Sequence, residues 1–341
     1  MRYRPDSDDD RHRSESEGLL SEVVRGLAGR PQATLPAKLL YDVRGCELFD
    51  QICDLPEYYP TRTERALLER VAPDIARRAD ADELVELGSG MARKTHVLLG
   101  AMGASDRSLT YLPFDVSAVA IRESAEHLTS RFPGLAVHGV VGDFTRDLHL
   151  IPEGSSRIIA FLGGTIGNLD DTAARLFLGK IARVMDTGDS FLLAADLVKP
   201  QRLLHAAYND SAGITAAFNL NALVRLKREL GAELTESDFS HDAFFNEAES
   251  RIEIHARARR ATRIAIGARG FERAFEAGES VCTEISRKFT PASLARLLAS
   301  AGLLTEELYL DPIGYALVLA RRPDSARRQA PRCEWPSSPA T

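Results

Sequence analysis

Residues 83–90 read ELVELGSG, a short apolar run that ends in a glycine turn. Such a run is typical of a buried strand in a parallel sheet, because helices cover both faces of such a sheet. Glycines directly after the strand let the backbone approach a ligand closely. The segment therefore predicts the first strand of an α/β domain, with a ligand site at the carboxyl end of that strand.

Further strands and helices are predicted to alternate downstream of this run. The strands are Leu109–Phe114, Leu135–Val141, Arg157–Leu162 and Ser190–Asp196, followed near the end of the chain by Thr305–Leu310 and Tyr315–Ala320. The helices are Ala92–Met102, a segment that Ser117 caps and that ends at about Arg131, Thr172–Met185, and Thr290–Ala301. Strands that alternate with helices at this spacing predict βαβ units and a parallel sheet.

The pattern changes after Leu197. Residues 212–231 are predicted to form one long helix, and residues 243–266 contain stretches in which every second residue is apolar, as do residues 271–275. A period of two is typical of antiparallel strands that are covered on one face. This region therefore has a different architecture from the sheet that precedes it.

Two domains are expected, each built from two stretches of chain. A Rossmann-like α/β domain would comprise residues 63–198 and 287–321, and an inserted α+β domain would comprise residues 18–62 and 199–286. The ends differ in composition, since residues 1–17 are charged and poor in apolar side chains and residues 322–341 are rich in Pro, Ser and Arg. Both compositions predict disorder.

The composition of the 341 residues argues against several classes of protein. The net charge is −6, whereas a nucleic-acid-binding protein usually carries a basic surplus. The cysteines, Cys46, Cys53, Cys282 and Cys333, form no C-x-x-C pair and have no histidine at zinc spacing, which predicts reduced thiols and no metal site. No apolar run approaches the length of a signal-peptide core or a membrane span. We therefore expect a cytoplasmic protein with neither nucleic-acid nor membrane partners.

Glycines and acids gather where the predicted parallel strands end. They are Gly88, Gly90, Asp115, Asp143, Gly163 and Gly164. Open α/β sheets bind ligands at this edge, and an acid that ends the second strand is placed to hydrogen-bond ribose hydroxyls. Asp143 would lie near an adenine amino group. The alternative for both acids is that they cap their own loops.

The glycine turn decides which nucleotide fits. A dinucleotide fingerprint needs a third small residue where this chain has Arg93, so no glycine triplet remains to cradle a pyrophosphate. A ligand made of adenosine and an amino acid needs ribose recognition but no phosphate cradle. S-adenosylmethionine is such a ligand and is the predicted cofactor, with Lys94 either facing its carboxylate or lying on the helix surface.

Five segments make the chain resemble a known family. They are Tyr41–Gly45 (YDVRG), Leu55–Glu64 (LPEYYPTRTE), Glu86–Gly90 (ELGSG), Phe161–Asn168 (FLGGTIGN) and Thr283–Ser286 (TEIS). Together they resemble the L-histidine Nα-methyltransferases of ergothioneine biosynthesis over about residues 35–321. The second and fourth segments are specific to this family and its close relatives, whereas ELGSG alone indicates only a methyltransferase.

The resemblance implies a function and a set of site residues. A class I Rossmann-like domain would bind S-adenosylmethionine and release S-adenosylhomocysteine, and the inserted domain would hold L-histidine. Three methyl transfers to the α-amine would give hercynine, the first step of ergothioneine biosynthesis. The implied cofactor contacts are Tyr41, Gly88, Lys94, Asp115, Asp143 and Phe144. The implied substrate contacts are Gly163, Thr165, Tyr208, Thr215, Phe218, Ile254, the imidazole-binding pair Glu284 and Ser286, and the catalytic pair Tyr58 and Asn168.

Two departures from the family pattern leave the ring specificity open. Ile254 stands where a methionine is common, and Leu220 also departs from the pattern. Isoleucine is shorter at its tip and stiffer than methionine. The alternatives are an α-N-methyltransferase for another amino acid, such as tryptophan or tyrosine, and a cofactor-binding homologue without catalysis.

The expected mechanism follows from the chemistry of a free amine. An α-amino group titrates at about pH 8, so a neutral nucleophile is available without a strong base. Catalysis is therefore expected to rest on orientation and proximity, without a metal ion. The enzyme is expected to act as a monomer on a small-molecule substrate.

Overall fold

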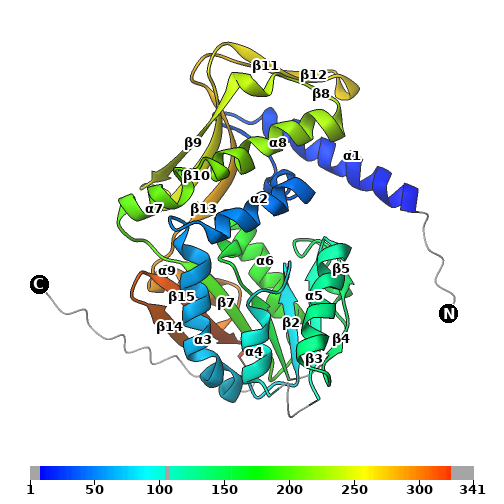
Figure 1. Ribbon diagram of the computed structural model, residues 1–341, viewed down its shortest axis with the longest axis vertical. Coiled ribbons are helices and arrows are strands. Elements are labelled where there is room, and N and C mark those ends of the chain that lie inside the picture. Colours follow the sequence, from blue (N-terminus) through cyan, green and yellow to red (C-terminus); the bar gives the residue numbers. More distant parts are fainter. Residues whose placement is uncertain (1–7, 104–107, 155, 324–341) are drawn as a thin grey trace, which may run out of the picture.

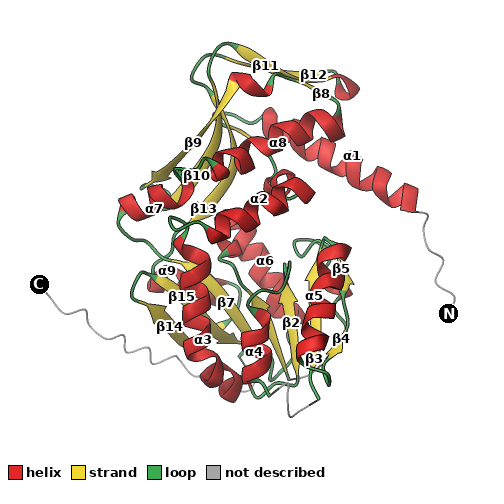
Figure 2. Ribbon diagram, in the orientation of Figure 1, coloured by secondary structure: helices red, strands yellow, loops and turns green. Residues whose placement is uncertain are grey.

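The computed structural model describes residues 8–103, 108–154 and 156–323, with side chains described from Glu17 onward. Figure 1 shows two stacked parts, a lower part built on one large sheet and an upper part in which helices lie beside smaller sheets. Figure 2 shows that helices flank the large sheet, as expected for an α/β domain. Among the described residues, no helix is both long and apolar enough to cross a bilayer.

The lower part contains an eight-stranded sheet. Its order is β14-β15-β7-β6-β2-β3-β4, with the short strand β5 also paired to β3. The bounds are β2 Glu83–Leu87, β3 Thr110–Asp115, β4 Ala136–Val137, β5 Val140–Val141, β6 Arg157–Phe161, β7 Ser190–Asp196, β14 Leu304–Asp311 and β15 Tyr315–Arg321. The strands from β2 to β7 pair in parallel, whereas β15 is antiparallel to both β7 and β14.

The order of the parallel strands reverses at β2. Strands β3 and β4 follow it on one side, and β6 and β7 lie on the other. Doubly wound sheets bind ligands outside the carboxyl ends of their strands at such a reversal. The glycine turns that follow β2 and β6 therefore lie next to each other at the expected binding edge.

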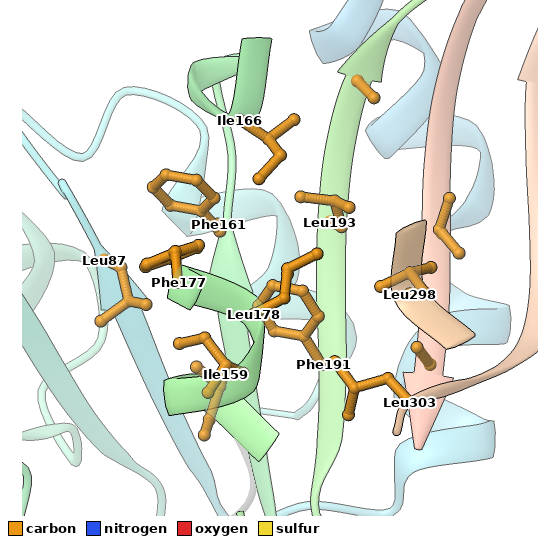
Figure 3. Packing of buried hydrophobic residues seen from close by; sticks show 14 of the residues in the cluster. Leu87, Ile159, Phe161, Ile166, Phe177, Leu178, Phe191, Leu193, Leu298 and Leu303 are labelled. Carbon is orange, nitrogen blue, oxygen red and sulfur yellow. The ribbon is translucent and has the colours of Figure 1, made fainter. Parts of the chain in front are cut away.

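Apolar side chains alternate between the two faces of this sheet. Leu84 lies in a core with helices α3 (Tyr59–Ala79), α4 (Thr95–Ala101) and α5 (Ala118–Arg131). Its neighbour Val85 lies in a second core with α6 (Asp171–Val184) and α9 (Pro291–Ser300). In Figure 3, Phe177 and Leu178 of α6 pack near Phe161 and Phe191 of the sheet. Burial on both faces explains why the central strands are mostly apolar.

The upper part has its own sheets and its own core. One sheet has the order β1-β13-β10-β9 and the other the order β12-β11-β8. The strand bounds are β1 Ala33–Thr34, β8 Ala232–Glu233, β9 Phe239–Asn246, β10 Arg251–Ala258, β11 Thr262–Ile266, β12 Phe271–Phe275 and β13 Ser280–Arg287. The helices are α1 Asp8–Leu27, α2 Val43–Asp54, α7 Gln201–Tyr208 and α8 Ile214–Leu230. A third apolar core joins side chains from the chain before residue 59 with others from α8 and these sheets.

Helix α1 corrects the expectation that residues 1–17 are disordered, because the helix begins at Asp8. Its last turns carry an apolar stripe, Leu19, Leu20, Val23, Val24 and Leu27, that packs into the third core. Because these last turns are anchored in the core, the helix also includes the charged segment that precedes them, which has no apolar stripe of its own. Residues 1–7 of the predicted disordered start, and residues 324–341 of the predicted disordered tail, lie outside the described residues.

Other boundaries also differ from the predictions. Helix α4 begins at Thr95 rather than at Ala92, because Ala92 has a φ of +51° and belongs to the glycine turn. The strand predicted over residues 135–141 is split, with β4 beside the start of β3 and β5 beside its end. Helix α7 has no counterpart in the predictions, since it is short and lies where the two patterns meet.

Candidate active site

The first glycine turn and Asp115 form one hydrogen-bonded unit at the carboxyl ends of β2 and β3. Gly88 and Gly90 have φ values of +66° and +50°, which favour glycine. The backbone N–H of Gly90 donates to one oxygen of Asp115 at 2.9 Å, and that of Ser117 donates to the other at 2.9 Å. Each carboxylate oxygen can accept more than one hydrogen bond. The Asp115 carboxylate is partly exposed and can therefore accept further donors from a ligand.

Glu64 of helix α3 links the second glycine turn to Lys94. Gly163 and Gly164 follow β6 with φ values of +77° and +67°. The backbone N–H of Gly163 donates to one oxygen of Glu64 at 2.8 Å, while the Lys94 ammonium and the Tyr315 hydroxyl bind the other. The Glu64 side chain is 1% exposed and that of Lys94 is 16% exposed. Lys94 is thus a half-buried ion-pair partner of a buried carboxylate rather than a free cation on the helix surface.

Asp143 and Phe144 lie on the loop after β5. The Asp143 carboxylate accepts from the backbone N–H of Thr145 at 2.8 Å and pairs with Arg146 at 3.3 Å. These bonds lie within its own loop, as the alternative interpretation of a loop-capping acid predicts. Phe144 packs its ring edge-on against Phe161, with ring centres 5.1 Å apart. A Cβ atom at Gly88 would lie 3.5 Å from this ring. Phe144 therefore sits directly beside the first glycine turn.

Glu284 on strand β13 joins three segments that are distant in the sequence. Its carboxylate accepts from the Tyr41 hydroxyl at 3.2 Å and from the Asn168 amide at 3.0 Å. Asn168 ends the 3₁₀ helix η3 (Thr165–Asn168), which follows the second glycine turn. Burial raises the pKa of Glu284 to about 7, although the Tyr41 hydrogen bond and the charge of Lys288 oppose the rise. Near neutral pH this group can therefore exchange a proton or accept a hydrogen bond.

Ser286 lies two residues further along β13, on the same face as Glu284. The Tyr208 hydroxyl donates to its oxygen at 2.8 Å, and the Lys288 ammonium donates to the same oxygen at 2.7 Å. Ile254 on β10 pairs directly with Glu284 across the ladder and is buried. The face therefore combines a carboxylate, a hydroxyl and an apolar wall, as the imidazole-binding expectation requires.

A row of aromatic rings lines the boundary between the two parts. The ring centres of Tyr58 and Tyr208 are 6.2 Å apart, those of Phe49 and Tyr58 are 6.3 Å apart, and those of Tyr41 and Phe218 are 5.3 Å apart. Burial raises the pKa of both Tyr41 and Tyr58 well above the ordinary value. Their hydroxyls therefore stay protonated near neutral pH and can donate hydrogen bonds, but they are poor bases.

The structure joins several of the predicted residues in combinations that the sequence does not show. Tyr41 and Asn168 share Glu284, although one was predicted to contact the cofactor and the other the substrate. Thr165 donates its hydroxyl to the Leu162 carbonyl at 3.0 Å. The backbone N–H of Thr215 on α8 donates to the Asp210 carboxylate at 2.8 Å. Leu220, also on α8, packs at the edge of the third core.

Sequence reasoning missed several charged residues at the site, namely Glu64, Asp196, Lys199 and Lys288. Asp196 ends strand β7, so the rule that selected Asp115 would have selected it as well. Lys288 follows Glu284 and Ser286 at the same two-residue spacing, and that spacing would have placed all three on one face. Glu64 lies in the PTRTE segment but gives no local sign that it is buried.

The reversal of strand order, the glycine turns and the acid ending β3 together define a Rossmann-like, S-adenosylmethionine-dependent methyltransferase. A family model described as histidine-specific methyltransferase, SAM-dependent, matches residues 19–322. The chain therefore belongs to the family of histidine-specific, S-adenosylmethionine-dependent methyltransferases.

Curated relatives agree with this assignment. The chain is 44% identical to the histidine N-alpha-methyltransferase of Mycolicibacterium smegmatis over 310 residues, covering 91% of this chain and 96% of that protein. It is 42% identical to the protein of the same name from Mycobacterium tuberculosis over 315 residues, covering 91% and 98%. It is also 31% identical to ergothioneine biosynthesis protein 1 of Schizosaccharomyces pombe over 225 residues, covering 62% of this chain and 29% of that protein.

Replacing Asp115 with alanine should weaken the binding of S-adenosylhomocysteine by about 10- to 150-fold. The carboxylate is charged, and a hydrogen bond to a charged group contributes about 1.5–3 kcal/mol. Isothermal titration would measure the change. Asp170→Ala is the control, because Asp170 caps helix α6 through the Ala173 N–H at 2.7 Å and belongs to neither glycine turn. Equal affinity of wild type and Asp115→Ala, or binding of NAD by the wild type, would contradict the assignment.

Proposed function

We propose that this protein transfers methyl groups from S-adenosylmethionine to the α-amine of L-histidine, three times in succession, to give hercynine. This reaction is the first step of ergothioneine biosynthesis. The observation that carries the proposal is Glu284, a half-buried carboxylate that accepts hydrogen bonds from Tyr41 and Asn168 at the boundary between the two parts. A carboxylate in this position suits an imidazole N–H and is poorly suited to an apolar ring.

The residues at the sheet edge fit the cofactor. Gly88 is exposed and has no Cβ atom that would crowd a ligand beside Phe144. Asp115 would accept the ribose hydroxyls, Asp143 would lie near the adenine, and Tyr41 and Lys94 would stand at the amino-acid end. Bound S-adenosylmethionine supplies the methyl group from its sulfonium centre. The work left to the protein is to hold a neutral amine in line with that group.

The aromatic and amide side chains would hold the substrate's backbone. Asn168 has both a donor and an acceptor, so it can bind an amine and a carboxylate together. Tyr58 would donate to the carboxylate, and Gly163, Thr165, Tyr208, Thr215 and Phe218 would line the same space. Because Tyr58 is a poor base, catalysis rests on orientation and proximity, which can supply about 7–11 kcal/mol of a barrier.

The proposal assigns the two roles to the two parts of the fold. Residues 63–198 and 287–321 would bind the cofactor, and residues 18–62 and 199–286 would bind histidine. Glu284 and Ser286 come from the second set, whereas Asn168 comes from the first and donates to Glu284. We further propose that the enzyme acts as a cytoplasmic monomer on free histidine, with no metal ion and no nucleic acid.

Substrates that lack a free α-amine or a carboxylate should not be methylated. N-acetylhistidine offers no neutral amine to the cofactor, and histamine offers no carboxylate to Asn168 and Tyr58. We expect turnover of both compounds to fall by at least about 100-fold relative to histidine, since misplacement of a nucleophile costs about that much. Mass spectrometry of the products measures this, in a screen that includes the other free amino acids. Methylation of N-acetylhistidine as fast as histidine would show instead that the ring is the acceptor.

A further inference from the structure

Lys288 follows strand β13 and lies fully inside the protein. Its side chain is 1% exposed. Its ammonium nitrogen lies 2.9 Å from the Tyr208 hydroxyl, 2.7 Å from the Ser286 hydroxyl and 2.9 Å from the Asp196 carboxylate. An ammonium group has three hydrogens and cannot accept a hydrogen bond. These three partners therefore use the whole donor capacity of Lys288, and both hydroxyl oxygens must accept from it.

The number of available hydrogens determines which hydrogen bonds the two hydroxyls can still make with a ligand. Tyr208 and Ser286 are 2.8 Å apart and share one hydrogen between them. A phenol is the stronger donor of the two, so Tyr208 donates and Ser286 accepts. The Ser286 oxygen thus accepts from both Lys288 and Tyr208, which fills its two lone pairs. Ser286 keeps one free hydrogen, and toward a ligand it can only donate.

We propose that Lys288 is a positioning residue that makes Ser286 a fixed hydrogen-bond donor, so that the site selects a ring with one acceptor nitrogen and one N–H. This inference rests on the proposed function. Glu284 accepts and Ser286 donates at positions two residues apart on one strand face, about 6.8 Å along the strand. A five-membered ring flanked by two hydrogen bonds of about 2.9 Å fills such a span. Neutral imidazole has the matching pair of nitrogens, whereas imidazolium has two N–H groups and no acceptor.

The charge on Lys288 is secured by its surroundings. Burial disfavours the ammonium form, but the Asp196 carboxylate and the Tyr208 hydroxyl hold the pKa of Lys288 above its ordinary value. In turn, although burial opposes ionisation, Lys288 and Lys199 keep the pKa of Asp196 below its ordinary value. Lys288 therefore stays a donor at every pH at which the enzyme would work.

Lys199 provides a matched control. It binds the other oxygen of Asp196 and lies 3.9 Å from the centre of the Tyr59 ring, whereas Lys288 bonds the two hydroxyls. Because two ammonium groups share one carboxylate, removing either lysine leaves Asp196 paired with the other. Lys199→Met and Lys288→Met thus disturb the same ionic cluster, but only the second removes the hydrogen bond to Ser286.

The test compares histidine with the two carbon-linked isomers of pyrrolylalanine, whose rings keep an N–H but have no acceptor nitrogen. Wild type should prefer histidine by about 10- to 100-fold in kcat/KM, because the Ser286 donor is unpaired beside a pyrrole. In Lys288→Met, Ser286 can turn its hydrogen to Tyr208 and accept instead. The preference should then fall to about threefold or less, while Lys199→Met keeps the wild-type preference. Thermal unfolding of both variants confirms that they are folded.

Ser286→Ala tests the same idea while leaving every charge of the ionic cluster in place, and its result decides the matter if Lys288→Met does not fold. It should lose the preference as Lys288→Met does. An undiminished preference in Ser286→Ala, or in folded Lys288→Met, would overturn the inference, as would an equal loss in Lys199→Met. If wild type methylates histidine but one of these results overturns the inference, the proposed function still stands. Wild type that does not methylate histidine at all would overturn the proposed function and this inference together.

Discussion

Replacing Glu284 with alanine is expected to reduce the preference for histidine over tryptophan by about 30- to 1000-fold in kcat/KM. The carboxylate would accept a charge-assisted hydrogen bond from the imidazole N–H, and the loss of such a bond costs about 2–4 kcal/mol here. The same change removes a polar group that an apolar ring leaves unpaired, so tryptophan should improve. Ile254, which pairs with Glu284 across the ladder, would then contact the ring through an apolar surface.

Glu284→Gln is the control variant, because glutamine has nearly the same shape as glutamate but does not titrate. The pH dependence of KM therefore distinguishes this variant from the wild type. Burial raises the pKa of Glu284 to about 7, so the carboxylate is progressively lost as the pH falls below 7. Protonation of the substrate imidazole, at about pH 6.5, should raise the KM for histidine in both enzymes as the pH falls. The KM of wild type should rise more steeply than that of Glu284→Gln, because only wild type also loses the carboxylate. An unchanged histidine-to-tryptophan ratio in Glu284→Ala would remove this residue from substrate recognition and leave only the methyltransferase assignment.

The same shift also predicts a change in stability. The folded chain binds the Glu284 proton more tightly than the unfolded chain does, because burial raises the pKa only in the folded state. The contribution of this group to the free energy of unfolding is therefore largest below its ordinary pKa and falls as the pH rises to about 7. Glutamine at position 284 does not titrate. The melting temperature of Glu284→Gln minus that of wild type should therefore be larger at pH 8 than at pH 5. Differential scanning calorimetry at both values measures this difference.

Glu64→Ala is expected to lower the free energy of unfolding by about 3–5 kcal/mol. Removing one partner of a buried ion pair leaves the other charge uncompensated, which is among the most destabilising single changes. Here the substitution leaves the Lys94 ammonium, the Tyr315 hydroxyl and the Gly163 N–H without their shared acceptor. Because Gly163 belongs to the second glycine turn, affinity for S-adenosylhomocysteine should fall as well.

A surface ion pair on the same helix provides the comparison for Glu64. Glu69 pairs with Arg65 at 2.8 Å, and both side chains are about half exposed. Glu69→Ala should change the free energy of unfolding by less than about 1 kcal/mol, because water screens exposed pairs. Chemical denaturation of both variants measures the difference. Equal midpoints for Glu64→Ala and wild type would show that the buried pair does not stabilise the fold.

The sequence by itself determined the features that depend on near neighbours. The strand at residues 83–87, the glycine turn after it and the N-cap of α5 at Ser117 are all where local pattern predicts them. The change from a helix-and-strand alternation to a period of two correctly indicated a second architecture after residue 197. These signals are local because strand periodicity, backbone φ and capping are set by residues within a few positions of each other. Asp115 was found for the same reason, since it ends a strand.

Only the tertiary structure decided how these features combine into a site. Glu284 meets Tyr41 and Asn168 across 243 and 116 residues of sequence, and Lys94 meets Glu64 across 30. Helix α1 extends into a charged segment because its apolar turns are anchored in a distant core. No local pattern encodes such contacts, because they arise when separate elements pack and bury their polar groups together. A charged residue that packing buries must find a partner there, and the contact of Lys288 with the distant Asp196 meets that requirement without any motif that predicts it.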